Sequence, residues 1–151
     1  MKRRQKRDNP HAARSRARKR AVQALYQWEI TRQDAGDILR QFTEEQDMGR
    51  VDVEYFEALV NGTVAAVEAL DAVIAGFLDR ELDRLDVMEK SLLRLGAFEL
   101  RDRIEVPFKV VINEAVSLAD TFGTEQSPTY VNAVLDRCSG EWRAVEYAAA
   151  K

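Results

Sequence analysis

Apolar residues recur along this chain at steps of three and four, the spacing of helices that bury one face. The first such stripe predicts a helix from about residue 11 to residue 30. A short second helix follows over Ile38, Leu39 and Phe42, with Asp34 as its N-cap. The third stripe is the longest, from about Asp52 to Leu78. Three helices of this kind can close one bundle.

A charged segment over residues 79–86 predicts a short helical turn that leads into a second set of helices. Residues 88–103 are apolar around most of a helical circumference, which is typical of a central helix, and Gly96 indicates a close crossing there. Residues 107–122 are rich in Val and Ile, which also suits a strand. Their apolar positions do not alternate, however, so a helix that ends at Gly123 is favoured. The last helix begins at Ser127 and Pro128 and keeps an apolar face as far as Val145.

We therefore predict an all-α fold of two three-helix bundles with about seven helices. A single helical domain spans residues 10–151, with subdomains of about 10–78 and 79–151, after a disordered basic leader over residues 1–9. The longest uncharged stretch, from Ala58 to Val67, is half of what a membrane-spanning helix needs. No apolar segment follows the basic start, and the only cysteine is Cys138. We expect a cytoplasmic protein that does not enter a membrane.

Charge divides the chain into a basic start and an acidic body. Ten of the first twenty residues are Lys or Arg, opposed only by Asp8, whereas the remaining residues include 13 basic and 25 acidic side chains. The first segment carries +9 and the rest −12, so the formal net charge of −3 conceals a segment suited to polyanions.

Candidate catalytic chemistry is sparse. The only histidine, His11, lies in the basic segment, and the glycines do not form a phosphate-binding loop. We expect no enzyme activity, no cofactor and no metal site. Glu99, Asn113 and Glu114 interrupt apolar stretches, and we interpret them as structural: Glu99 bonded to Arg103, or an amide that joins two helices.

The arginines at 14, 16, 18 and 20 would point in nearly all directions around a helix, so we expect the first half of this helix to project from the body. Guanidinium groups match phosphate oxygens and stack on bases, which favours single-stranded nucleic acid. The alternative is a solubility tail or a nonspecific polyanion patch. Tyr26 and Tyr130 lie off the apolar stripes and could stack a base, although packing at the edge of the core would also explain them.

Six segments, in order between Ala13 and Asp136, give the sequence a specific resemblance to the NusB family of bacterial transcription antitermination factors. They are Ala13–Arg18, Ala21–Glu29, Glu89–Leu100, Pro107–Val116, Phe122–Gly123 and Tyr130–Asp136. The resemblance implies an all-helical fold without catalysis and binding to boxA RNA in the leader transcripts of ribosomal RNA operons. It also implies a partner, NusE, the small-subunit ribosomal protein that doubles as a transcription factor.

The resemblance also assigns candidate site residues. It implies RNA contacts for Arg14, Arg16 and Arg18, completed by Gln126 and Tyr130. We expect alanine at the three arginines to weaken RNA binding and to leave thermal stability nearly unchanged. Contacts with the protein partner are implied for Tyr26 and Glu89. Whether the free chain forms a homodimer is left open.

We interpret the function as a clamp formed with NusE on boxA RNA as it leaves RNA polymerase, within an antitermination complex that resists Rho-dependent termination. Two alternative functions from other classes of protein remain. The helical RNA-binding domain of certain ribosomal RNA cytosine methyltransferases also resembles the NusB family, although such an enzyme needs a further cofactor-binding domain. The second is a protein-interaction scaffold with an incidental basic segment.

Overall fold

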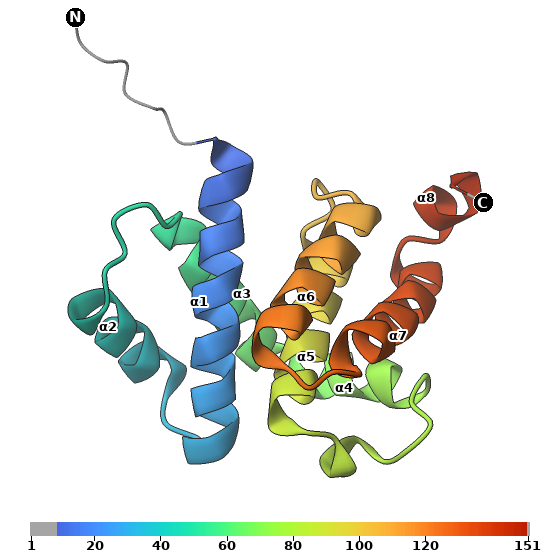
Figure 1. Cartoon of the computed structure of the whole chain (residues 1–151), viewed down its shortest axis with the longest axis horizontal. Coiled ribbons are helices and arrows are strands. Elements are labelled where there is room, and N and C mark those ends of the chain that lie inside the picture. Colours follow the sequence, from blue (N-terminus) through green and yellow to red (C-terminus); the bar gives the residue numbers. More distant parts are fainter. Residues whose placement is uncertain (1–8, 151) are drawn as a thin grey trace, which may run out of the picture.

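The structure is a computed structural model that describes residues 9–150 (Figure 1). Within that range every regular element is helical, which confirms the all-α prediction. The expected leader over residues 1–9 lies outside the described residues except for Asn9. The elements are α1 (Pro10–Thr31), α2 (Ala35–Glu45), α3 (Val53–Ala65), α4 (Val67–Ala75), the 3₁₀ turn η1 (Leu82–Arg84), α5 (Val87–Asp102), α6 (Phe108–Phe122), α7 (Ser127–Trp142) and α8 (Ala144–Ala149).

Both ends of α1 follow from local chemistry. The side chain of Asn9 accepts a hydrogen bond from the backbone N–H of His11 at 2.8 Å, and Pro10 occupies the first turn, where no N–H is needed. The helix ends at Thr31, and the next residue, Arg32, has a left-handed backbone with a φ of 56°. The predicted cap of the next helix is confirmed, because Asp34 accepts from the backbone N–H of Gly36.

The predicted helix from Asp52 to Leu78 is wrong as a single element. The chain bends by 71° between α3 and α4, and Ala66 at the bend leaves helical geometry with φ −103° and ψ 11°. The bend lets α4 pack on α5 and α7, so that Leu70 and Ile74 are fully buried. A straight helix would carry these apolar side chains away from that core.

The central position of α5 is confirmed. All residues from Glu89 to Leu100 are buried, and α5 packs against α1, α3, α4, α6 and α7 (Figure 1). The predicted close crossing lies at Gly96, where an added Cβ would stand 2.7 Å from a methyl group of Leu135 on α7. The absence of a side chain at Gly96 therefore sets how closely α5 and α7 approach.

The helical interpretation of residues 107–122 is confirmed, and α6 ends immediately before Gly123. Gly123 is extended rather than left-handed, with a φ of −95°. A Cβ at this position would lie only 2.6 Å from the Cβ of Ser127, so the tight turn into α7 requires a residue without a side chain.

The end of the chain differs from the prediction. The last predicted helix is divided at Arg143, whose guanidinium donates to the backbone carbonyls of Leu100, Glu99 and Arg103. The new direction of α8 leaves Val145 87% exposed, so its expected place on the buried face is wrong.

No single helix in the described range is long and apolar enough to cross a membrane; only the bent pair of α3 and α4, taken together, reaches that length and composition. The division into subdomains near residue 78 stays a prediction. The packing of α4 on α5 and α7 joins the two halves through a shared core.

Candidate nucleic-acid interface

Arg18 lies in a buried ion cluster rather than at the surface. Its side chain is 2% exposed, and its Nε donates to both oxygens of Glu99, at 2.9 and 3.0 Å. Its Nη1 donates to Glu114 at 3.2 Å. Burial lowers the pKa of Arg18, but the bond and charge of Glu99 outweigh it, so the pKa is raised and the side chain stays charged. An RNA contact by Arg18 would require it to leave this cluster.

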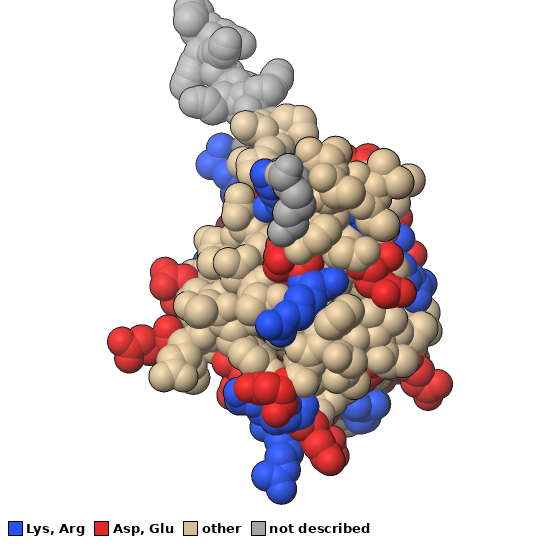
Figure 2. Space-filling model, turned by 90° about the vertical axis from the view of Figure 1, so that its right-hand side faces the viewer, with Lys and Arg blue, Asp and Glu red and all other residues tan. Residues whose placement is uncertain are grey.

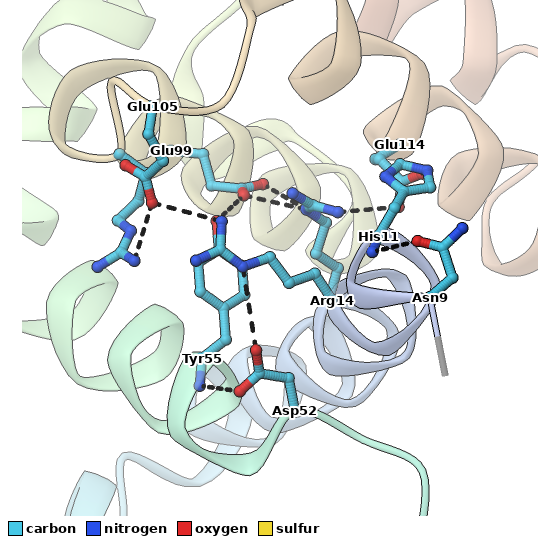
Figure 3. Close-up of polar contacts among 10 residues, drawn as sticks. Asn9, His11, Arg14, Asp52, Tyr55, Glu99, Glu105 and Glu114 are labelled. Atoms are coloured by element: carbon cyan, nitrogen blue, oxygen red, sulfur yellow. Dashed lines mark hydrogen bonds and ion pairs between the residues drawn. The ribbon is translucent and has the colours of Figure 1, made fainter. Parts of the chain in front are cut away.

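Glu99 joins α5 to α1 and α3. Besides accepting from Arg18, it accepts a hydrogen bond from the hydroxyl of Tyr55 (Figure 3). Burial and the charge of Glu99 raise the pKa of Tyr55, so the hydroxyl keeps its proton and remains a donor. The structural interpretation of Glu99 is thus confirmed, but Arg103 is the wrong partner, because it pairs with Glu105 instead.

Arg14 covers the outer side of the same cluster. Its guanidinium carbon stands 3.9 Å from the centre of the Tyr55 ring, and it reaches Glu105 at 3.3 Å and Asp52 at 4.0 Å (Figure 3). The side chain is 30% exposed, so part of it remains accessible. His11 lies nearby, 3.6 Å from Glu114.

The expectation that the first half of α1 projects from the body is therefore wrong. Residues 12–16 are half-buried, and the backbone N–H of Asp52 donates to the carbonyl of Ala13 at 3.2 Å. A helical wheel of α1 places arginines in every direction. It cannot show that Arg18 forms ion pairs with Glu99 of α5 and Glu114 of α6. The expectation that all three arginines can be removed with little loss of stability stays untested, but the buried pairing of Arg18 with Glu99 argues against it for Arg18.

Tyr26 and Ile30 lie one turn apart on α1 and are 38% and 58% exposed. The expected exposure of Tyr26 is confirmed. These side chains form an apolar strip on a surface helix, the kind of feature that another protein can cover. Its role in partner binding stays a prediction.

Glu89 has a different environment from Tyr26. It is 8% exposed and accepts a hydrogen bond of 2.6 Å from the hydroxyl of Ser127, at the first residue of α7. This bond fixes the start of α7 beside α5. Little of the Glu89 side chain is therefore accessible for a direct contact with a partner protein.

Gln126 and Tyr130 lie at the start of α7. Gln126 is exposed, and Tyr130 is half-buried, with its hydroxyl donating to Asp79 at 3.2 Å and Arg80 lying 4.7 Å from its ring centre. In Figure 1 the loop between α6 and α7 is far from the N-terminal end of α1. The structure brings Arg14 and Arg18 together but leaves Gln126 and Tyr130 at a separate place.

Among the residues that the structure describes, the face formed by α7 and α8 carries no concentrated positive charge (Figure 2). Figure 2 shows acidic and basic side chains interspersed with uncharged ones on that side. Asn113, expected to be structural, is exposed on α6. Within residues 9–150 no group of three or more His, Cys, Asp or Glu side chains is arranged to hold a metal ion.

A second buried ion cluster joins α1, α4 and α5 at the other end of α1. Glu29 accepts from Lys90 at 3.0 Å and from Arg94 at 2.7 Å, and Arg94 also donates to both oxygens of Asp71. Burial raises the pKa of Glu29, but the bonds from Arg94 and Lys90 outweigh it and hold the pKa at about 2. The Glu29 carboxylate is therefore ionised at neutral pH.

Glu29 should make stability pH-dependent in the acid range. The pKa of its carboxyl is lowered from the ordinary value of 4.5 to about 2. The contribution of Glu29 to the free energy of unfolding is therefore complete above about pH 5 and is lost as the pH falls toward about 2. In urea unfolding, Glu29→Gln should be less stable than the wild type at pH 7, and the difference should shrink as pH falls toward 3. Glu44→Gln, at an exposed position, is the control. An equal difference at both pH values would contradict this role.

Comparison with known proteins decides the family. The sequence profile of the NusB family matches residues 15–140. The transcription antitermination protein NusB of Stenotrophomonas maltophilia is 47% identical over 133 residues, which cover 88% of this chain and 84% of that protein. This chain belongs to the NusB family. The NusB of Yersinia pestis is 49% identical over 126 residues, covering 83% and 91% of the two chains.

Solved structures of NusB proteins share the fold. T. maritima NusB superposes with a TM-score of 0.80 at 29% identity, covering 94% of this chain and 99% of that one. A NusB in a crystal structure of antitermination factors NusB and NusE with dsRNA has a TM-score of 0.72 at 26% identity, with the same coverages. The fold of this NusB-family chain is thus one that occurs in a protein–RNA complex.

Sequence reasoning missed several functional candidates in this NusB-family chain. Lys19 and Arg20 belong to the basic segment, but their grouping with Arg50 could not be seen, because the loop before α3 brings Arg50 back to α1. The three consecutive basic residues Arg18 to Arg20 were a signal, although the family resemblance implies a role for only the first of them. The roles of the seven predicted site residues remain proposals.

Proposed function

We propose that this chain acts as a transcription antitermination factor that binds boxA RNA of ribosomal RNA leader transcripts together with NusE. The observation that carries the proposal is membership of the NusB family along most of the chain. The related complex of NusB and NusE with dsRNA supports both kinds of partner. The uneven charge supports an RNA contact at the start of α1.

Within this proposal the arginines have different tasks. Arg14 and Arg16 contact RNA, because both remain partly accessible at the N-terminal end of α1. Arg18 positions that end of the helix through Glu99 and Glu114, and it does not contact RNA. Gln126 and Tyr130 provide a second contact, where the partly exposed Tyr130 ring stacks a base.

The apolar strip of Tyr26 and Ile30 is the proposed NusE contact. Exposed aromatic side chains often contribute much of the binding energy at protein interfaces. Glu89 supports the interface indirectly by holding Ser127 and the start of α7. The complex with NusE then holds RNA as it leaves RNA polymerase and opposes Rho-dependent termination.

Light scattering of the chain with purified NusE, with and without boxA RNA, tests this function. We expect a 1:1 complex and an approximately tenfold weaker association for Tyr26→Ala. Val145→Ala removes another exposed apolar side chain, on α8, and should leave association unchanged. The mass of the free chain also shows whether it forms a homodimer. Failure to associate with NusE under any RNA condition would contradict the proposal.

A further inference from the structure

A pocket of about 340 Å³ lies between α6, α7 and α8. We call it the amide pocket, after the two asparagines in its lining. The lining includes Phe108, Ile112 and Asn113 from α6, Asn132 and Asp136 from α7, and Tyr147 from α8. Sites for small organic molecules have volumes of this order and combine apolar walls with a few polar groups. The amide pocket therefore has the size and the composition of a ligand site.

Contacts between α8 and α6 fix one wall of the amide pocket. Glu146 of α8 accepts a hydrogen bond from the backbone N–H of Phe108 at 2.9 Å, and Arg143 donates to Glu146 at 2.7 Å. The Tyr147 ring meets the Phe108 ring edge to face, with ring centres 5.5 Å apart. The two aromatic side chains therefore form a wall of set orientation, against which a flat ring can pack.

The polar groups of the amide pocket come from α6 and α7. Asn113 and Asn132 are exposed, and among residues 9–150 neither side chain forms a hydrogen bond. Each of these amides offers both donors and an acceptor. The Oδ2 of Asp136 accepts from the Tyr147 hydroxyl at 2.9 Å, whereas its Oδ1 has no partner within the same part of the chain. Two amides and one carboxylate oxygen are thus available to a ligand.

The charge of the amide pocket does not suit a phosphate group. Its described lining has one cation, Lys109, and one carboxylate, Asp136, and none of these lining residues belongs to α1. Figure 2 shows acidic and basic side chains interspersed over the side formed by α7 and α8. A neutral ring with hydrogen-bonding edges matches this pocket better than an anion does.

We propose that the amide pocket binds an adenine base. Asparagine forms paired hydrogen bonds with N6 and N7 of adenine, and a carboxylate accepts from an exocyclic amino group of a base. The flat face of adenine also packs on aromatic side chains. The inference does not depend on the proposed RNA-binding function, because the base can belong to a free nucleotide or to an RNA strand.

The test measures binding of adenosine to the full chain by calorimetry. Inosine is the matched ligand, because it carries a carbonyl oxygen where adenosine carries the amino group. Asn132→Ala removes one amide of the pocket, and Asp136→Asn exchanges the free acceptor for an amide of similar size. Asn61→Ala is the matched control, since it removes an exposed amide from α3.

We expect adenosine to bind with a dissociation constant on the order of 0.1 mM, which is ordinary for a ligand of this size. Inosine should bind at least fivefold more weakly, and Asn132→Ala and Asp136→Asn should each weaken adenosine binding at least fivefold. Asn61→Ala should keep the wild-type affinity. Thermal unfolding of each variant confirms that the compared proteins are folded.

Absence of saturable adenosine binding by the wild type would overturn the inference, as would equal affinities for adenosine and inosine. Titration of the same variants with boxA RNA, with NusE present, identifies the source of the base. A matching loss for Asn132→Ala assigns it to RNA, and an unchanged RNA affinity assigns it to a free nucleotide. Absence of boxA binding by the wild type would contradict the proposed function alone and would leave the adenosine result in place.

Discussion

Replacement of Arg18 by alanine is expected to lower the free energy of unfolding by about 3–5 kcal/mol, because it leaves a buried carboxylate without its partner. Glu99 is 1% exposed, and Arg18 donates to both of its oxygens. The Tyr55 hydroxyl that remains cannot balance the charge. Urea unfolding at pH 7 measures the loss.

Arg16→Ala is the matched control for Arg18→Ala, since it removes a half-buried arginine of the same helix that donates to the backbone carbonyl of Arg50. Its loss should stay within about 1 kcal/mol. The double variant Arg18→Met/Glu99→Gln should be more stable than Arg18→Ala, because no unpaired charge remains in the core. An Arg18→Ala protein as stable as Arg16→Ala would show that the cluster contributes little.

Salt should weaken RNA binding strongly. If the chain and NusE together neutralise about four to six phosphates of a single strand, the slope of log K against log salt is about −3 to −4. Affinity should then fall roughly 60- to 250-fold between 50 and 200 mM salt. Fluorescence anisotropy of labelled boxA RNA measures this change.

The slope also distinguishes electrostatic contacts from base contacts. Tyr130→Ala should lower affinity by about 1–3 kcal/mol without a change of slope, because stacking releases no counterions. A flat salt dependence for the wild type would contradict the role given to the basic start. A steeper slope with a duplex would still be compatible with phosphate contacts, since a duplex releases more counterions for each phosphate.

Most of the fold could be predicted because helical stripes are local. The periodicity of α5 and the turn at Gly123 depend on residues a few positions apart. The bend at Ala66 could not be predicted, because it depends on the core that α5 and α7 offer to α4. The stripe from Phe56 to Ile74 continues through the bend without interruption, so it carries no signal of the change in direction.

The candidate site was harder to predict, because accessibility depends on partners distant in sequence. Glu99 lies 81 residues from Arg18, and nothing near Arg18 indicates which carboxylate it meets. In the same way, Arg16 donates to the backbone carbonyl of Arg50, which lies 34 residues away. The basic segment therefore predicted the kind of ligand, whereas the structure separates the buried Arg18 from Arg14 and Arg16, which remain partly exposed.

The most direct test of the central claim is competition between boxA RNA and a scrambled RNA of equal length and composition, with NusE present at fixed salt. We predict that the chain and NusE bind boxA at least tenfold more tightly than the scrambled strand. Equal affinity for the two strands would contradict it, because electrostatic attraction alone does not distinguish sequence.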